Sequence, residues 1–185
     1  MEMRSIKVRD AVPGADAETM LTIYAPFIES TSITFEETVP TVRAFAERVQ
    51  STQGAHPWIV AEVDGVLAGY AYASAHRTRA SYRWCVESSI YVNPAQQTSG
   101  IGRVLYQELF RRLRRQNYCN VYAGIAIPNP ASVGFHTALG FRSIGTYAKV
   151  GYKMRQWHDV LWMEFALGEH PQRPLEPTKV VSGQA

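Results

Sequence analysis

The sequence predicts an α/β fold, in which a mixed sheet of about six or seven strands carries helices on both faces. Three observations predict it. Strand-like and helix-like patterns alternate along the chain, an Asp64-Gly65 hairpin signal joins two of the strands, and a strand at 88–92 leads through a glycine loop into an amphipathic helix. The chain has 185 residues, of which 46% are hydrophobic and 19% charged, so one domain with a full core is expected.

The first half of the chain combines edge, helical and hairpin patterns. In chain order they predict a strand, two helices and two strands, at 5–9, 16–29, 41–50, 58–63 and 66–75. Asp16 is a plausible cap of the first helix, and Pro26 is a place where that helix bends or ends. Residues 30–39 form a connection, and the two strands that flank Asp64-Gly65 are expected to pair antiparallel.

The second half alternates strands with helices and then closes with two strands. In chain order these elements are predicted at 88–92, 101–116, 118–127, 130–139, 141–149 and 160–166. Gly140 follows the last helix as a C-cap glycine. We expect residues 157–159 to form a corner before the last strand. Residues 168–185 are polar and rich in proline, so the predicted domain spans 1–167 and a tail spans 168–185.

Charge and cysteine usage argue against several classes of partner. The net charge of +3 comes largely from arginines at the end of the central helix, where cations complement the helix dipole, so no nucleic-acid partner is expected. Cys85 and Cys119 have neither CxxC spacing nor a neighbouring histidine cluster, which indicates free thiols and no metal. The N-terminus lacks an apolar leader and no apolar run is long enough for a membrane span, so a cytoplasmic, membrane-free protein is expected.

The junction between the central strand and helix predicts a phosphate site. Gly100 and Gly102 precede a helix whose first N–H groups have no intrahelical partner and carry the positive end of the dipole. A dinucleotide-binding loop would need a third glycine where Leu105 stands. A P-loop would need lysine and then serine or threonine where Arg103 and Val104 stand. Neither familiar phosphate loop fits.

Residues 97–102, Gln-Thr-Ser-Gly-Ile-Gly, have the pattern Q/R-x-x-G-x-G/A, and this segment resembles the GNAT family of N-acetyltransferases in its flanking strand and helix as well. The resemblance implies acetyl-CoA as co-substrate. It assigns the backbone amides of Ile90, Tyr91 and Val92 to the pantetheine and acetyl groups. It assigns the pyrophosphate to a loop made of Gln97, Thr98, Ser99, Gly100, Ile101, Gly102 and Arg103.

A second motif of the same family lies downstream, as Asn129-x-x-Ser132-x-x-x-His136-x-x-x-Gly140-Phe141. Asn129 and Ser132 fall at cofactor-binding positions. Many members carry tyrosine at the position of His136, where it serves as general acid to the CoA thiolate. Histidine has an ordinary pKa near ~6.5, so it can accept as well as donate a proton around neutrality.

The stretch 82–92, reading YRWCVESSIYV, resembles the phosphinothricin N-acetyltransferase branch of the family, and this closer resemblance extends over 6–167. In that branch the matching glutamate and histidine act in deprotonating the amine. The resemblance therefore makes Glu87 and His136 a joint acid/base pair, acting directly or through water. It implies a ternary complex without an acetyl-enzyme, since neither cysteine has a nucleophile setting.

The same resemblance locates the acceptor pocket at Phe35, Arg77, Arg79 and Tyr82. Arginine suits a carboxylate or phosphinate, as an amino-acid analogue would present. Members of the branch carry lysine near Arg77 and aspartate where this chain has Arg83, which are departures at the acceptor side. Homodimerisation is implied too, with residues 149–157 near the partner's site.

Two other functions remain open from the sequence. One is acetylation of a different amine, such as a protein N-terminus, a polyamine or an aminoglycoside, although a polycationic acceptor would call for an acidic pocket and this loop is basic. The other is a non-catalytic CoA-binding regulatory module. Such a module needs only the glycine loop, whereas this chain has Glu87 and His136 as well.

Overall fold

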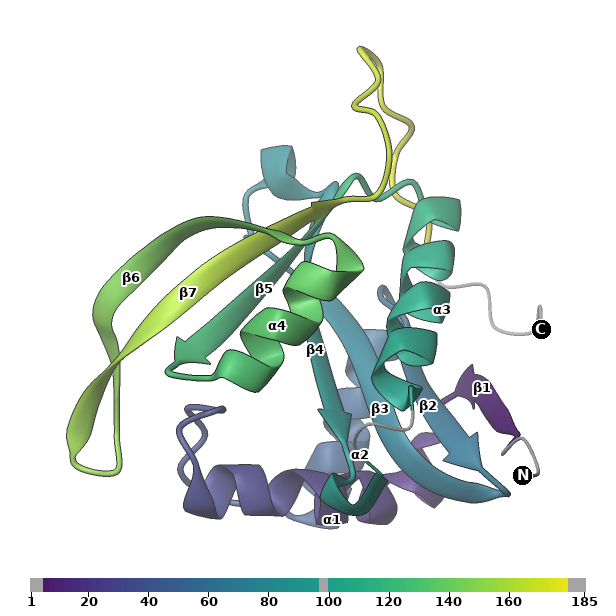
Figure 1. Ribbon diagram of the computed structural model, residues 1–185. Coiled ribbons are helices and arrows are strands. Elements are labelled where there is room, and N and C mark those ends of the chain that lie inside the picture. The colour runs from purple at the N-terminus through teal and green to yellow at the C-terminus, as the bar shows by residue number, and fades with distance from the viewer. Residues whose placement is uncertain (1–4, 97–99, 180–185) are drawn as a thin grey trace.

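The computed structural model describes residues 5–96 and 100–179 (Figure 1). Seven strands form one mixed sheet in the order β1-β2-β3-β4-β5-β7-β6, which confirms the predicted α/β class. The strands are β1 (Ile6–Asp10), β2 (Trp58–Val63), β3 (Val66–Ala75), β4 (Cys85–Val92), β5 (Asn120–Ile127), β6 (Arg142–Lys153) and β7 (Gln156–Ala166). The helices are α1 (Pro13–Ser30), α2 (Val42–Gln53), α3 (Ile101–Arg115), α4 (Pro130–Leu139) and the 3₁₀ turns η1 (Ala80–Tyr82) and η2 (Pro94–Gln96).

Helices cover both faces of the sheet, and strand β2 shows why. Its side chains alternate between two cores: Ile59 and Ala61 pack in the core under α3, whereas Trp58 and Val60 pack in the core under α1 and α2. Figure 1 shows α3 and α4 on one side of the sheet and α1 and α2 on the other. A strand that is apolar on both faces is therefore fully buried.

Helix α3 carries the apolar face that the sequence predicts. Ile101, Leu105, Leu109 and Leu113 are at most 1% exposed. The arginines of its last turns form ion pairs. Arg112, for example, pairs with Glu108 four residues before it and with Asp10 of β1. Arg111 likewise pairs with Glu108 three residues before it, so the fold itself provides acidic partners for these arginines.

Helix α1 begins three residues before the predicted start. Pro13 occupies the first helical turn, a position where its missing N–H costs nothing, and Pro26 is accommodated inside the helix. Asp16 is not the N-cap residue. Its carboxylate instead accepts a 2.7 Å hydrogen bond from the backbone N–H of Val12 and pairs with Arg9 at 2.6 Å, which anchors the helix to β1.

The last two strands are longer than predicted and form a hairpin. Met154 and Arg155 make its turn, with φ of 53° and 63°, and Lys153 pairs with Gln156 across it. Two successive positive φ values are typical of a type I′ turn. Residues 157–159 therefore lie inside β7, so the predicted corner is wrong. The hairpin extends away from the body of the molecule in Figure 1.

The chain after β7 has no helix or strand in its described part, up to residue 179, yet it contacts the body. The Glu176 carboxylate accepts two 2.7 Å hydrogen bonds from Arg83, and Trp84 donates from Nε1 to the Leu175 carbonyl at 2.8 Å. Gln116 also exchanges hydrogen bonds with the backbone of Thr178. The boundary at 167 stays a prediction. Among the described residues, no helix is long and apolar enough to cross a membrane.

Lys153 orders the connection between α1 and α2. Its ammonium donates to the carbonyl of Ile28 at 2.7 Å and to that of Thr34 at 2.8 Å. The last turn of α1 contains no basic residue, so a cation from β6 satisfies one of its terminal carbonyls, that of Ile28. The connection bearing Ile33 and Phe35 is thereby tied to the hairpin.

Replacement of this lysine tests the tie. Lys153→Met keeps the length of the side chain but leaves two carbonyls without their donor, so we expect the free energy of unfolding to fall by about 1–3 kcal/mol. Urea unfolding followed by circular dichroism measures the change. Lys7→Met on the exposed face of β1 is the matched control, and equal stability of the two variants would contradict the role.

Candidate active site

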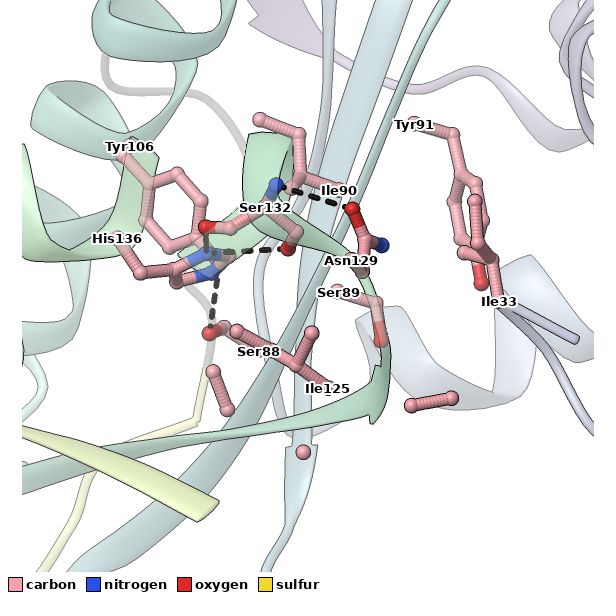
Figure 2. A pocket seen from close by; sticks show the side chains of 13 residues that line it. Ile33, Ser88, Ser89, Ile90, Tyr91, Tyr106, Ile125, Asn129, Ser132 and His136 are labelled. Atoms are coloured by element: carbon pink, nitrogen blue, oxygen red, sulfur yellow. Dashed lines mark hydrogen bonds between the residues drawn. The ribbon is translucent and has the colours of Figure 1, made fainter. Parts of the chain in front are cut away.

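A pocket opens where the two parallel strands in the middle of the sheet separate. β4 and β5 pair through only three positions: Cys85 with Asn120, Val86 with Val121, and Glu87 with Tyr122. Beyond them β4 stays with β3 and β5 stays with β7. The pocket in this gap is lined by 88–91 of β4, 123–126 of β5, Ile33, Tyr106, Asn129, Ser132 and His136 (Figure 2).

The gap leaves a strand edge facing the pocket. From Ser88 onward, β4 has a ladder only on its β3 side, so N–H and C=O groups of 88–92 that face β5 are free for a ligand. Ile90 and Tyr91 line the pocket, and Val92 ends the strand. An extended, amide-containing molecule can bind such an edge as an added strand does.

His136 lies at the inner wall of the pocket and is buried at 4% exposure. Its Nδ1 lies 2.8 Å from the Ser132 carbonyl, which can only accept, so Nδ1 carries the hydrogen and Nε2 accepts from the Tyr106 hydroxyl at 2.9 Å. Tyr106 in turn lies 3.0 Å from the Ser88 hydroxyl (Figure 2). A hydrogen-bonded chain thus runs from Ser88 on β4 to His136 on α4.

Burial sets the protonation states of Tyr106 and His136 in this series of hydrogen bonds. It lowers the pKa of His136, while the hydrogen bond to the Ser132 carbonyl opposes the shift, so the ring is neutral around pH 7. Burial also raises the pKa of Tyr106 well above its usual value, which keeps the phenol protonated. Tyr106 was missed in the sequence because it lies on the apolar face of α3, where an aromatic residue is expected to be core.

Asn129 and Ser132 lie at the start of α4. The Asn129 side-chain oxygen accepts the backbone N–H of Ser132 at 3.1 Å, which is an N-cap interaction, and Pro130 occupies the first turn. The cap leaves the Asn129 side-chain amino group as a donor toward the pocket (Figure 2). Both residues thus line the pocket, and Asn129 also begins the helix that carries His136.

Glu87 lies on the opposite face of β4 from Ser88, because successive strand side chains alternate. Its Oε1 is 2.9 Å from Nδ1 of His76 and 3.7 Å from a guanidinium nitrogen of Arg77. The structure therefore places Glu87 and His136 on the two faces of the sheet rather than in contact. His76 was not predicted: a lone histidine directly after a strand gives no signal of a partner on the next strand.

The predicted acceptor residues fall into two groups. Arg77 lies beside Glu87, and the Tyr82 ring meets the ring of His76, the partner of Glu87, edge-on at 6.2 Å. Arg79 precedes η1 in the same exposed loop. Phe35 lies apart, packed so tightly on the backbone of Gly151 that a side-chain carbon there would come within 2.2 Å of its ring. Arg83, where the resembled branch carries aspartate, forms an ion pair with Glu176 of the segment after β7.

The glycine loop is partly outside the described residues, which include Gly100 but not Gln97, Thr98 and Ser99. Gly100 precedes α3 with a left-handed φ of 84°. A side-chain carbon at Gly102 would lie 3.0 Å from the Phe135 ring, so packing of α3 on α4 accounts for that glycine. The first N–H groups of α3, from Ile101 to Arg103, remain suited to an anion.

Comparison with known proteins identifies the class. Residues 10–162 match the family described as Acetyltransferase (GNAT) domain, so the chain belongs to the GNAT family. It is therefore an acyltransferase that uses acetyl-CoA. Among the described residues, no group of three or more His, Cys, Asp or Glu side chains could hold a metal.

Three similar proteins are acetyltransferases named for small amino-acid analogues. The chain is 37% identical to Phosphinothricin N-acetyltransferase of Streptomyces viridochromogenes over 95% of this chain and 96% of that protein. It is 38% identical to the L-methionine sulfoximine/L-methionine sulfone acetyltransferase of Salmonella typhimurium, over 62% of this chain and 67% of that protein. Among solved structures, the GNAT superfamily phosphinothricin acetyltransferase of Sinorhizobium meliloti in complex with AcCoA superposes on this fold with a TM-score of 0.85. The two sequences are 36% identical, and the match covers 98% of this chain and 96% of that protein.

The buried state of His136 predicts a pH dependence of stability. In the unfolded chain this histidine titrates near 6.5, whereas in the fold burial lowers its pKa. The unfolded state therefore binds the proton first, so stability is full above about 6.5, falls as the pH drops below that value, and levels off below the folded pKa. Urea unfolding at about pH 7.5 and about pH 5.5 measures the effect. The free energy of unfolding should fall less between the two pH values in His136→Asn than in the wild type.

A second histidine provides the comparison. Burial lowers the pKa of His56 as well, so His56→Asn should also reduce the acid sensitivity, and the double variant should reduce it further. If the free energy of unfolding of His136→Asn fell with acid as much as that of the wild type, the neutral, buried state of His136 would be contradicted.

Proposed function

We propose that this enzyme transfers the acetyl group of acetyl-CoA to the amino group of a small amino-acid analogue: phosphinothricin, methionine sulfoximine or methionine sulfone. The observation that carries the proposal is the strand gap, which is flanked by Glu87 on one face of β4 and by the Ser88–Tyr106–His136 chain on the other. The names of the relatives support this class of acceptor.

The proposed reaction is a direct attack within a ternary complex. The thioester lies in the gap, and the acceptor approaches on the face of Glu87, which removes a proton from the ammonium group. The amine nitrogen then bonds to the thioester carbon, and free backbone N–H groups of β4 stabilise the oxyanion. The C–S bond breaks, and the electron pair leaves on the CoA sulfur.

His136 is proposed to complete the proton balance. A neutral imidazole must gain a proton before it can donate one, so His136 acts as a relay. Through water it accepts the second proton, which the attacking nitrogen loses as the amide forms, and it passes a proton to the CoA thiolate. The cysteines do not favour an acetyl-enzyme. Burial raises the pKa of Cys85 and of Cys119, which favours the unreactive thiol, and the pocket lining includes neither.

The basic loop after β3 is proposed to bind the acceptor's anionic group. Arg77 lies beside Glu87, and Arg79 is in the same exposed loop, so guanidinium groups stand near the point where an amine would meet the base. A carboxylate or phosphinate would find charge-assisted donors there. Ile33 lines the pocket, and Phe35, two residues later in the same connection, is proposed to bound the acceptor.

We also infer that two copies pair through the β6–β7 hairpin. Large apolar side chains on it are about half exposed, namely Tyr147, Val150, Tyr152, Met154 and Trp157. Burial of such a patch against a second copy is favourable, and the resemblance to the phosphinothricin branch implies the same contact.

A panel of acceptors tests the proposed substrate class. With acetyl-CoA and a thiol-reactive dye, CoA release should be seen with phosphinothricin, methionine sulfoximine and methionine sulfone, and should be far slower with spermidine, an aminoglycoside or an N-terminal peptide. Turnover restricted to the peptide or the polyamine would show a different acceptor on the same fold. CoA binding without release for any amine would indicate a regulatory module.

Single substitutions test the assigned roles. Glu87→Ala and His136→Ala should each lower kcat by about 100-fold, with little change in acetyl-CoA affinity, since general acid–base catalysis contributes about 10²–10⁴. Arg79→Ala should mainly raise the acceptor KM, by about 10-fold, through loss of a charge-assisted bond.

Arg83→Ala is the matched control for the acceptor loop, because Arg83 belongs to the same loop but pairs with Glu176. Full activity in both the Glu87 and His136 variants would remove the acid/base assignment. An equal rise in KM for the Arg79 and Arg83 variants would remove the specific role of Arg79.

A further inference from the structure

We propose that His76 is a positioning residue for Glu87, fixing the carboxylate so that one oxygen faces the acceptor amine. The inference rests on the proposed role of Glu87 as the base. It concerns a residue that no sequence motif assigns, and it depends on contacts made by three different strands.

The hydrogen bond between the two side chains has a defined direction. His76 directly follows β3, and its Nδ1 lies 2.9 Å from Oε1 of Glu87 on the neighbouring strand. An ionised carboxylate can only accept, so Nδ1 carries the hydrogen. The His76 side chain is 14% exposed and that of Glu87 is 32% exposed, so the pair is partly shielded from competing water.

Three aromatic rings hold the imidazole in place. It stacks on Tyr122 of β5 with ring centres 4.4 Å apart and planes 25° apart. Trp162 of β7 and Tyr82 meet it edge-on, at 5.9 Å and 6.2 Å. Since ring stacking and edge contacts fix the imidazole plane, they also fix the direction of its N–H bond.

The arrangement leaves one carboxylate oxygen for chemistry. Both contacts described for the Glu87 carboxylate, with His76 and with Arg77, engage Oε1. Oε2 is then the oxygen available to the amine. A base held in one rotamer avoids the entropic cost of orientation at each turnover, which is the usual benefit of a supporting hydrogen bond around a reactive group.

Two substitutions separate hydrogen bonding from packing. His76→Phe keeps a ring on Tyr122 but removes the donor, whereas His76→Asn keeps an N–H donor close to the Nδ1 position but removes most of the ring. We expect kcat to fall about 10-fold in His76→Phe and to stay within about 3-fold of the wild type in His76→Asn, with the acceptor KM and acetyl-CoA affinity little changed in both. A packing role predicts the reverse order, with His76→Asn the less stable and less active variant, and that result would overturn the proposal.

A double-variant comparison separates this inference from the proposed function. If His76 acts through Glu87, His76→Phe should have no further effect in a Glu87→Gln background. Wild-type turnover in Glu87→Gln alone would mean that the proposed base is wrong. An impaired Glu87→Gln together with a fully active His76→Phe would mean that only the positioning role is wrong.

The protonation of the ring provides a readout that needs no acceptor. In ¹H–¹⁵N spectra of the imidazole groups, the neutral His76 ring should carry its hydrogen on Nδ1. In Glu87→Ala the partner is lost, and the hydrogen should move largely to Nε2. A wild-type ring protonated on Nε2, or a spectrum unchanged by Glu87→Ala, would contradict the hydrogen bond on which the proposal depends.

Discussion

The separation of β4 from β5 is the constraint on which the rest of the structure depends. Buried backbone groups without partners are costly, and a sheet that parts after three paired positions exposes such groups in its centre. The gap persists because each strand is fully supported on its other side, β4 by β3 and β5 by β7. The flanking helices then place Tyr106 and His136 at one mouth of the gap, and the connection with Ile33 lies at the other.

The alternation of side chains along β4 divides the chemistry between two environments. Glu87 lies among partly exposed aromatic and basic groups, whereas the next residue, Ser88, is bonded to a fully buried phenol. Adjacent residues thus face a partly exposed environment on one side of the sheet and a buried one on the other. Burial lowers the pKa of His136 and favours its neutral ring on the buried side, whereas Glu87 lies where water can reach it.

Local signals in the sequence predicted most of the fold. The Asp64-Gly65 hairpin, the apolar face of α3 and the Gly140 end of α4 depend on neighbouring residues and are found as expected. The errors have physical reasons. Pro13 can occupy the first turn of a helix, so α1 begins before the expected Asp16 cap, and the Met154-Arg155 turn adopts positive φ without glycine or asparagine. Of the site, Asn129, Ser132 and His136 line the pocket, whereas Tyr106 and His76 could not be predicted, because only tertiary contacts distinguish them from core or surface residues.

The tail that follows β7 has a practical consequence for handling the protein. Leu175 and Glu176 hold Trp84 and Arg83, which lie between the loop of Arg79 and the strand of Glu87. A recombinant enzyme trimmed at the end of its last strand would lose these hydrogen bonds and leave the Trp84 indole N–H and the Arg83 guanidinium to water.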